Sequence, residues 1–168
     1  MKAIVPLLLV AALAAAGSTC AADDGATKPA AEPAAVPAYD AELAKRFGAD
    51  ERGMRQYVLV VLKTGPTPVP AGDRRKEMFA GHFANMERLS KAGKLVLAGP
   101  FGKNEDGWRG LFVFAVANIE EARALVATDP VIVNGEMVAE LHPWYGSAAV
   151  MAIPDLHAKL TPPKPAAP

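Results

Sequence analysis

Four apolar segments, with helical stretches after the first and third, constrain the fold of this chain more than any other feature. The segments are rich in β-branched and aromatic residues, which favours strands: QYVLVVL (56–62), KLVLAGPF (94–101), RGLFVFAV (109–116) and MVAELHPW (137–144). The resulting βαββαβ order predicts the α+β class and a ferredoxin-like fold. In that fold, both helices cover one face of a four-stranded antiparallel sheet.

The two predicted helices have recognisable start signals. Asp73 is expected to cap a helix that runs to about Ala92, and Asn118 has the form of a capping-box residue for a helix through about Ala127. DPVIVNGE (129–136) predicts a short turn or helical piece. The second and third strands are expected to form a hairpin with a long loop.

The sheet is predicted to be apolar on both faces. YVLVVL and LFVFAV are apolar at odd and even positions alike, so the face opposite the helices also needs a cover. We expect no further element of the chain to supply it. The sequence therefore predicts a homodimer in which two sheets face each other.

The chain is expected to have four parts: a signal peptide (1–22), an Ala/Pro-rich disordered tether (23–52), one domain (53–150) and a mostly disordered C-terminal tail (151–168). Residues 1–22 begin with a positive charge at Lys2, continue with an apolar stretch that is too short to span a bilayer, and end in small residues. Export to the periplasm or secretion is therefore expected. Within the tether, AYDAELAKRFG alone has helical character, which leaves room for a short docked helix.

The single cysteine has two interpretations. Signal cleavage after Ala21 or Ala22 removes Cys20, whereas a lipoprotein would retain it as an acylated N-terminus and attach the domain to a membrane. Gly17, Ser18 and Thr19 precede the cysteine and depart from a bacterial lipobox. Lipidation is therefore the minor alternative.

Charge and spacing argue against several classes of partner. The chain has 18 Lys+Arg and 18 Asp+Glu residues, so no net charge favours nucleic acid. Its three histidines lack metal-site spacing, and no glycine-rich phosphate loop precedes a helix. We expect neither a metal nor a cofactor.

His82 is the first candidate for chemistry. It lies four residues after Met78 and four before Met86, so on a helix it points with an apolar stripe. Two interpretations stay open: a buried neutral histidine bonded to a backbone carbonyl, or a general acid or base in an apolar cleft.

Asp129 also has two interpretations, which can coexist. Followed by Pro130, it has the form of a helix N-cap. Its second carboxylate oxygen can at the same time orient the imidazole of a His-Asp pair.

Further candidates for a ligand site come from strand ends and a helix start. Gly99, Pro100 and Phe101 end the second strand, where close backbone approach is possible, and Trp144 can wall a ligand site or cap the core. Arg75 lies in the first turn of a helix, which is unfavourable for the helix dipole; this suggests pairing with an acidic group or a ligand anion, and the alternative is a solvated charge.

Four blocks in order resemble a known family. They are the helix pattern H-F-x-x-M-x-x-L-x-x-x-G-K-L, the strand end AGPF, the segment EEARALVATDP and G-x-x-x-x-x-L-H-P-W. Together they resemble the YciI-like (YCII-related) domain of the dimeric α+β barrel group, over about residues 56–148. The resemblance implies a sheet-to-sheet dimer and a cleft holding a His-Asp pair, here His82 and Asp129.

The resemblance favours, without deciding, a cofactor-independent enzyme of the isomerase, lyase or hydrolase type that acts on a small carbonyl or lactone-like compound. The alternative is a non-catalytic periplasmic module that binds a small molecule or serves only for dimerisation. The export signal and the two tails depart from compact cytoplasmic members of the family.

Overall fold

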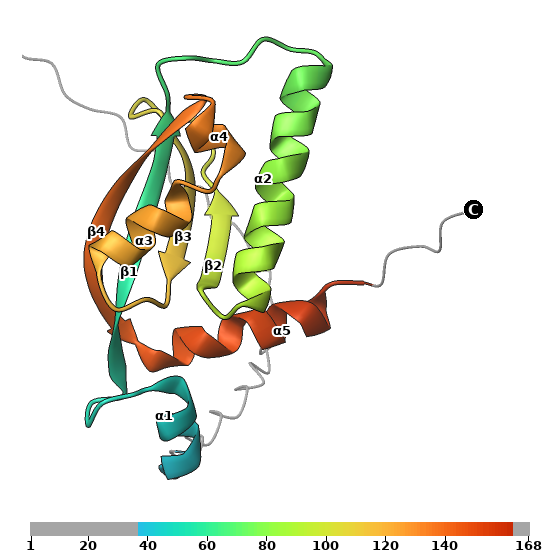
Figure 1. Cartoon of the computed structure of the whole chain (residues 1–168). Coiled ribbons are helices and arrows are strands. Elements are labelled where there is room, and N and C mark those ends of the chain that lie inside the picture. Colours follow the sequence, from blue (N-terminus) through green and yellow to red (C-terminus); the bar gives the residue numbers. More distant parts are fainter. Residues whose placement is uncertain (1–36, 163–168) are drawn as a thin grey trace, which may run out of the picture. The chain divides into compact units, whose positions relative to one another are not determined.

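The computed structural model describes residues 37–162, and all its elements belong to one compact unit that begins at Tyr39 (Figure 1). The four strands are β1 (Met54–Thr64), β2 (Leu95–Pro100), β3 (Trp108–Phe114) and β4 (Met137–Ser147). The helices are α1 (Ala41–Phe47), α2 (Asp73–Lys91), α3 (Ile119–Val126), α4 (Pro130–Val133) and α5 (Ile153–Leu160), with a short 3₁₀ helix η1 (Ala148–Ala152).

The strands form one antiparallel sheet in the order β2-β3-β1-β4, which confirms the predicted ferredoxin-like βαββαβ arrangement. The two longest strands, β1 and β4, pair without interruption from Met54↔Ser147 to Thr64↔Met137. β2 and β3 form the expected hairpin, and β2 is an edge strand.

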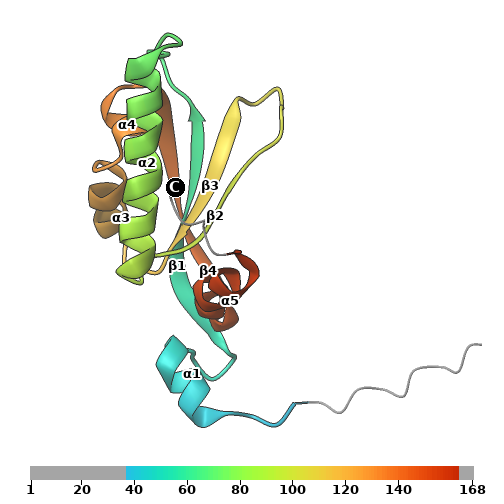
Figure 2. The same ribbon diagram turned by 90° about the vertical axis from the view of Figure 1, so that its right-hand side faces the viewer.

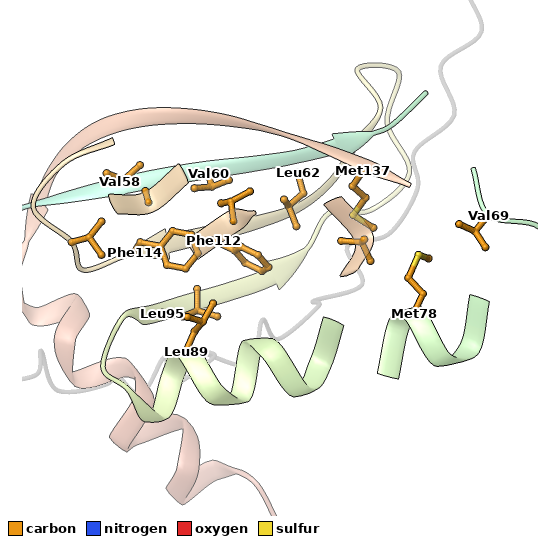
Figure 3. Close-up of a cluster of buried hydrophobic side chains, with 14 residues drawn as sticks. Val58, Val60, Leu62, Val69, Met78, Leu89, Leu95, Phe112, Phe114 and Met137 are labelled. Atoms are coloured by element: carbon orange, nitrogen blue, oxygen red, sulfur yellow. The ribbon is translucent and has the colours of Figure 1, made fainter. Parts of the chain in front are cut away.

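The main core lies between the sheet and helices α2, α3 and α4 (Figure 3). Alternate residues of β1 point to this face, namely Val58, Val60 and Leu62, as the two-residue period of a strand requires. Leu89 of α2 and Phe114 of β3 pack against them. Burial of this face therefore fixes the position of α2 over the sheet.

The opposite face carries a second, smaller cluster built on Tyr57, Val96 and Val113. Figure 2 shows α5 on this side of the sheet, opposite α2, α3 and α4. Val150 and Met151 of η1 pack against the cluster. This corrects the expectation that no element of the chain covers the second face. Residues 151–160, which were expected in a mostly disordered tail, instead form the end of η1 and the helix α5; Met151 packs against this cluster, and α5 contacts β2.

The remaining differences concern helix ends and the segments outside the domain. Gly72, rather than Asp73, occupies the N-cap position of α2, and Asp73 becomes the first helical residue, where a carboxylate still favours the helix dipole. α1 lies within the predicted tether, in its AYDAELAKRFG stretch. The predicted signal peptide (1–22), which includes Cys20, residues 23–36 of the predicted tether and residues 163–168 of the predicted tail lie outside the described residues.

Candidate active site

His82 lies on the face of α2 that packs against the sheet. The buried residues of this helix are Met78, His82, Asn85 and Leu89, a spacing that follows one side of an α-helix. Only 7% of the His82 surface is exposed. An ionisable ring at such a position needs a polar partner, because an unpaired buried polar group is costly.

Asp129 supplies that partner from the connection between α3 and α4. It is 2% exposed and caps α4, where its Oδ1 accepts a hydrogen bond from the backbone N–H of Val131 at 3.1 Å. Pro130 follows at the first helical position, which needs no donor. The cap fixes the direction of the carboxylate toward α2.

The two side chains are in direct contact. The Nδ1 atom of His82 lies 2.9 Å from Oδ1 and 2.8 Å from Oδ2 of Asp129, although the residues are 47 positions apart in sequence. An ionised carboxylate only accepts hydrogen bonds, so Nδ1 carries the proton and donates it. In the neutral ring, Nε2 is then the unprotonated nitrogen. Both structural roles of Asp129, helix cap and histidine partner, are therefore present together.

Gly81 allows the two helices to approach closely enough for this contact. A Cβ atom at this position would lie 3.0 Å from Cγ of Pro130, closer than carbon atoms normally pack. The absence of a side chain at Gly81 therefore sets the distance between α2 and α4, and with it the distance between His82 and Asp129.

His82 also lines a pocket of about 350 Å³. Aromatic rings surround the imidazole: Phe83 at 5.3 Å, Phe112 at 6.0 Å and Phe79 at 6.1 Å between ring centroids. Among residues 37–162, the hydrogen bonds of the imidazole all involve Nδ1. Nε2 is therefore the ring nitrogen left for a molecule in the pocket.

Three of the other predicted site residues lie at this pocket. Gly99, Pro100 and Phe101, at the end of β2, line it opposite α2. The hairpin brings them there because β2 runs alongside β3, which carries Phe112.

Trp144 does not lie at this pocket, which corrects its predicted placement. Its partner across β1 and β4 is Tyr57, whose ring centroid lies 5.4 Å away, and both belong to the cluster on the opposite face of the sheet. The register of β4 places Met137, Ala139 and Leu141 on the helix face and Trp144 on the other.

Arg75 is likewise not among the residues that line the pocket. Its guanidinium binds Glu136 through both terminal nitrogens, Nη1 to Oε2 at 2.8 Å and Nη2 to Oε1 at 2.6 Å. The position of Arg75 in the first turn of its helix suggested an acidic partner or a ligand anion, and the structure provides the acidic partner. Hydrogen bonding from Arg75 lowers the pKa of the Glu136 carboxyl, against the effect of its burial.

Two residues of this region were missed in the sequence. Glu136 is 2% exposed and accepts a further hydrogen bond from the N–H of Val69 at 2.7 Å, and Arg109 of β3 lines the pocket. Glu136 directly precedes the apolar residues that begin β4, and a carboxylate at such a position was a signal for a buried side chain that has a partner. Nothing in the sequence indicated the direction of the Arg109 side chain.

A larger cavity of about 470 Å³ lies between α2, β2 and α5. Its lining includes Lys91, Glu87 and His157, but neither His82 nor Asp129. We place the candidate active site in the smaller pocket, because there a buried, hydrogen-bonded pair of ionisable groups meets an accessible cavity.

Residues 37–162 contain no group of three or more His, Cys, Asp or Glu side chains arranged to hold a metal ion. His142 and His157 are exposed. None of the helices in this part of the chain is long and apolar enough to cross a membrane.

Comparisons with known proteins place the chain in a family. A search among curated proteins finds no match. Among solved structures, the chain is similar to 5-chloro-2-hydroxyhydroquinone dehydrochlorinase (TftG) from Burkholderia phenoliruptrix AC1100, in complex with 2,5-dihydroxybenzoquinone. The identity is 22%, the match covers 52% of this chain and 92% of that one, and the TM-score is 0.39. The family model of the YCII-related domain matches residues 55–145, more than half of the chain. The chain therefore belongs to the YCII-related domain family.

Proposed function

We propose that this protein is a cofactor-independent acid–base enzyme that acts on a small carbonyl or lactone-like compound. The observation that carries the proposal is the hydrogen bond from Nδ1 of His82 to Asp129, which leaves Nε2 for the pocket. His82 moves the proton, and Asp129 holds the ring orientation and stabilises the imidazolium that forms.

The lining of the pocket supports proton transfer rather than covalent catalysis by a hydroxyl or thiol. Among the described residues that line it, His82 and Arg109 have polar side chains, and the others are apolar or glycine. Nε2 removes a proton from carbon next to a carbonyl group, and the imidazolium returns that proton to a second atom of the substrate or to a leaving group. Such a sequence conserves protons and needs no electron acceptor.

The size and walls of the pocket indicate a small, partly apolar substrate. A volume of about 350 Å³ lies at the lower end of the range for small-molecule sites. Phe79, Phe83, Phe101 and Phe112 provide aromatic surface around His82, which suits a planar or cyclic compound.

The test is exchange of the acidic carbon-bound proton in D₂O. Small carbonyl and lactone compounds are incubated with the protein, and loss of the proton signal is followed by NMR. We expect exchange with the wild type, none above background with His82→Ala, and wild-type rates with His142→Ala, a change at an exposed histidine. Equal exchange by the wild type and His82→Ala would refute the role of His82.

The same variants distinguish the alternative of a non-catalytic binding protein. A compound that raises the melting temperature of the wild type and of His82→Gln equally, without proton exchange in either, would favour a binding protein. An enzyme requires that the exchange disappear in His82→Gln while folding is retained.

We also propose that the protein forms a homodimer through the part of the second sheet face that η1 and α5 leave uncovered. Val138 and Trp108 are 42% and 40% exposed there, and Lys63 and Glu140 form an ion pair at 3.0 Å on the same face. Sedimentation velocity tests this proposal. We expect a dimer for the wild type and a monomer for Val138→Glu, and a wild-type monomer at 100 µM would contradict it.

A further inference from the structure

We propose that Arg109 binds a carboxylate of the substrate, so that the pocket of His82 takes small carboxylic acids that also carry a carbonyl or lactone group. This inference rests on the proposed acid–base function of the same pocket and adds the substrate class. It is carried by an irregularity in β3, by the charges around Glu136 and by the composition of the pocket wall.

A β-bulge directs Arg109 toward the pocket. β1 and β3 pair as Leu62↔Gly110, but the next pair is Lys63↔Trp108, so Arg109 is an extra residue in β3. A bulge of this kind changes the direction of a side chain and is common beside active sites. As a result, Arg109 and Gly110 both line the pocket, although neighbouring strand residues normally point to opposite faces.

Glu136 does not fully neutralise the positive charge of Arg109. Glu136 already has a bidentate partner in Arg75 and a hydrogen bond from the Val69 N–H. The Nη1 atom of Arg109 lies 3.7 Å from Oε1 of Glu136. This distance is too long for a hydrogen bond, but the opposite charges still attract each other. Within residues 37–162, no hydrogen bond engages the Arg109 guanidinium, so its five N–H donors remain for a ligand.

Glu136 and Arg75 therefore act as support for Arg109. With one carboxylate between two guanidinium groups, one positive charge remains, and it lies on the side of the pocket. The attraction to Glu136 limits the freedom of the Arg109 side chain, which is 34% exposed. A guanidinium held in place loses less entropy when it binds a carboxylate through two parallel hydrogen bonds.

The wall of the pocket presents this positive charge without a competing negative one. Among the described lining residues there is no Asp or Glu, and Arg109 is the permanently charged side chain. Asp129 is 2% exposed and lies at Nδ1 of His82, away from the lining. An anion in these apolar surroundings interacts more strongly with Arg109 than it would in water.

The arrangement also assigns an orientation to the substrate. With its carboxylate on Arg109, a small acid has its remaining atoms among the aromatic side chains that surround His82. The carbon that loses its proton then faces Nε2. Arg109 thus selects the substrate and positions it, and His82 performs the proton transfer.

The experiment measures binding of benzoate and of its neutral analogue benzamide to the full chain by NMR titration. We expect benzoate to bind the wild type at least about tenfold more tightly than benzamide. Arg109→Gln is expected to weaken benzoate binding by about tenfold or more and to leave benzamide binding unchanged. Arg123→Gln, which removes the same charge from the exposed surface of α3, should bind both compounds as the wild type does.

Equal binding of benzoate and benzamide, no benzoate binding, or full benzoate binding by Arg109→Gln would each overturn the inference. If Arg109→Gln does not fold, Arg109→Lys gives the answer, because it retains the charge but loses the bidentate geometry. It should bind benzoate more weakly than the wild type, and wild-type affinity would overturn the inference. His82→Gln should retain benzoate binding, so a failure of the proton-exchange test and a failure of this one are separate results.

Discussion

Replacing Asp129 by alanine tests the contact on which the candidate site depends. The substitution removes two hydrogen bonds at once, the one from Nδ1 of His82 and the cap on the N–H of Val131. Both donors are buried, so the change leaves them without a partner where water replaces the carboxylate poorly. We expect a marked loss of stability without a change of fold.

The magnitude follows from the two contacts. A hydrogen bond to a charged group contributes about 1.5–3 kcal/mol, and loss of a helix N-cap costs about 1 kcal/mol. Asp129→Ala should therefore lower the free energy of unfolding by about 2.5–4 kcal/mol. In a His82→Leu background the histidine donor is absent, so the same change should cost only the cap, about 1 kcal/mol.

The assay is a double-mutant cycle at pH 7.5 with His82→Leu, Asp129→Ala and the combined variant. Urea unfolding followed by circular dichroism gives each free energy. We expect a coupling energy of about 1.5–3 kcal/mol between the two positions. A coupling energy below about 0.5 kcal/mol would show that the two side chains do not interact in solution, and would refute the reasoning.

Three further predictions concern the surroundings of this pair. Gly81→Ala should reduce proton exchange at least about tenfold, because the added methyl group displaces Pro130. The higher helix propensity of alanine should limit the loss of stability to below about 2 kcal/mol. Unchanged proton exchange would contradict this prediction. Glu136 has a folded-state pKa below its unfolded value of about 4.5, so its charge stabilises the protein above that pH. This contribution is lost as the pH falls through the folded pKa. Glu136→Gln should therefore flatten the acid side of a plot of unfolding free energy against pH, and an unaltered plot would argue against the Arg75 pair. Phe112→Ala, at a 4% exposed position beside the imidazole, should cost about 3–5 kcal/mol in chemical denaturation, and a loss under 1 kcal/mol would contradict its place in the core.

The order of the elements, the inward direction of His82 and the helix cap at Asp129 were accessible from the sequence because each depends on a local pattern. Continuous apolar segments indicated the strands, and the position of His82 between Met78 and Met86 indicated its inward direction. The cap signal at Asp129 was also local. Its pairing with His82 came from the resemblance to the family, and the structure shows the contact.

The parts that the sequence did not reveal depend on pairing between distant segments. The choice between a ligand site and the core for Trp144 was not accessible, because the direction of its side chain follows from the register of β4 against β1. Arg109 reaches the pocket only through a bulge, which is a property of two strands together. α5 lies on the second sheet face although its segment ends in a proline-rich stretch; Val150 and Met151 of η1, which precedes it, pack on an apolar cluster that the segment alone does not reveal.

The most direct test of the account is the tautomer of His82 in solution, read from the ¹⁵N chemical shifts of its two ring nitrogens at a pH where the ring is neutral. The account predicts a protonated Nδ1, bound to Asp129, and an unprotonated Nε2 in the wild type. It also predicts that Asp129→Ala shifts this preference. A protonated Nε2 in the wild type would contradict the account, because the nitrogen assigned to accept the substrate proton would already carry one.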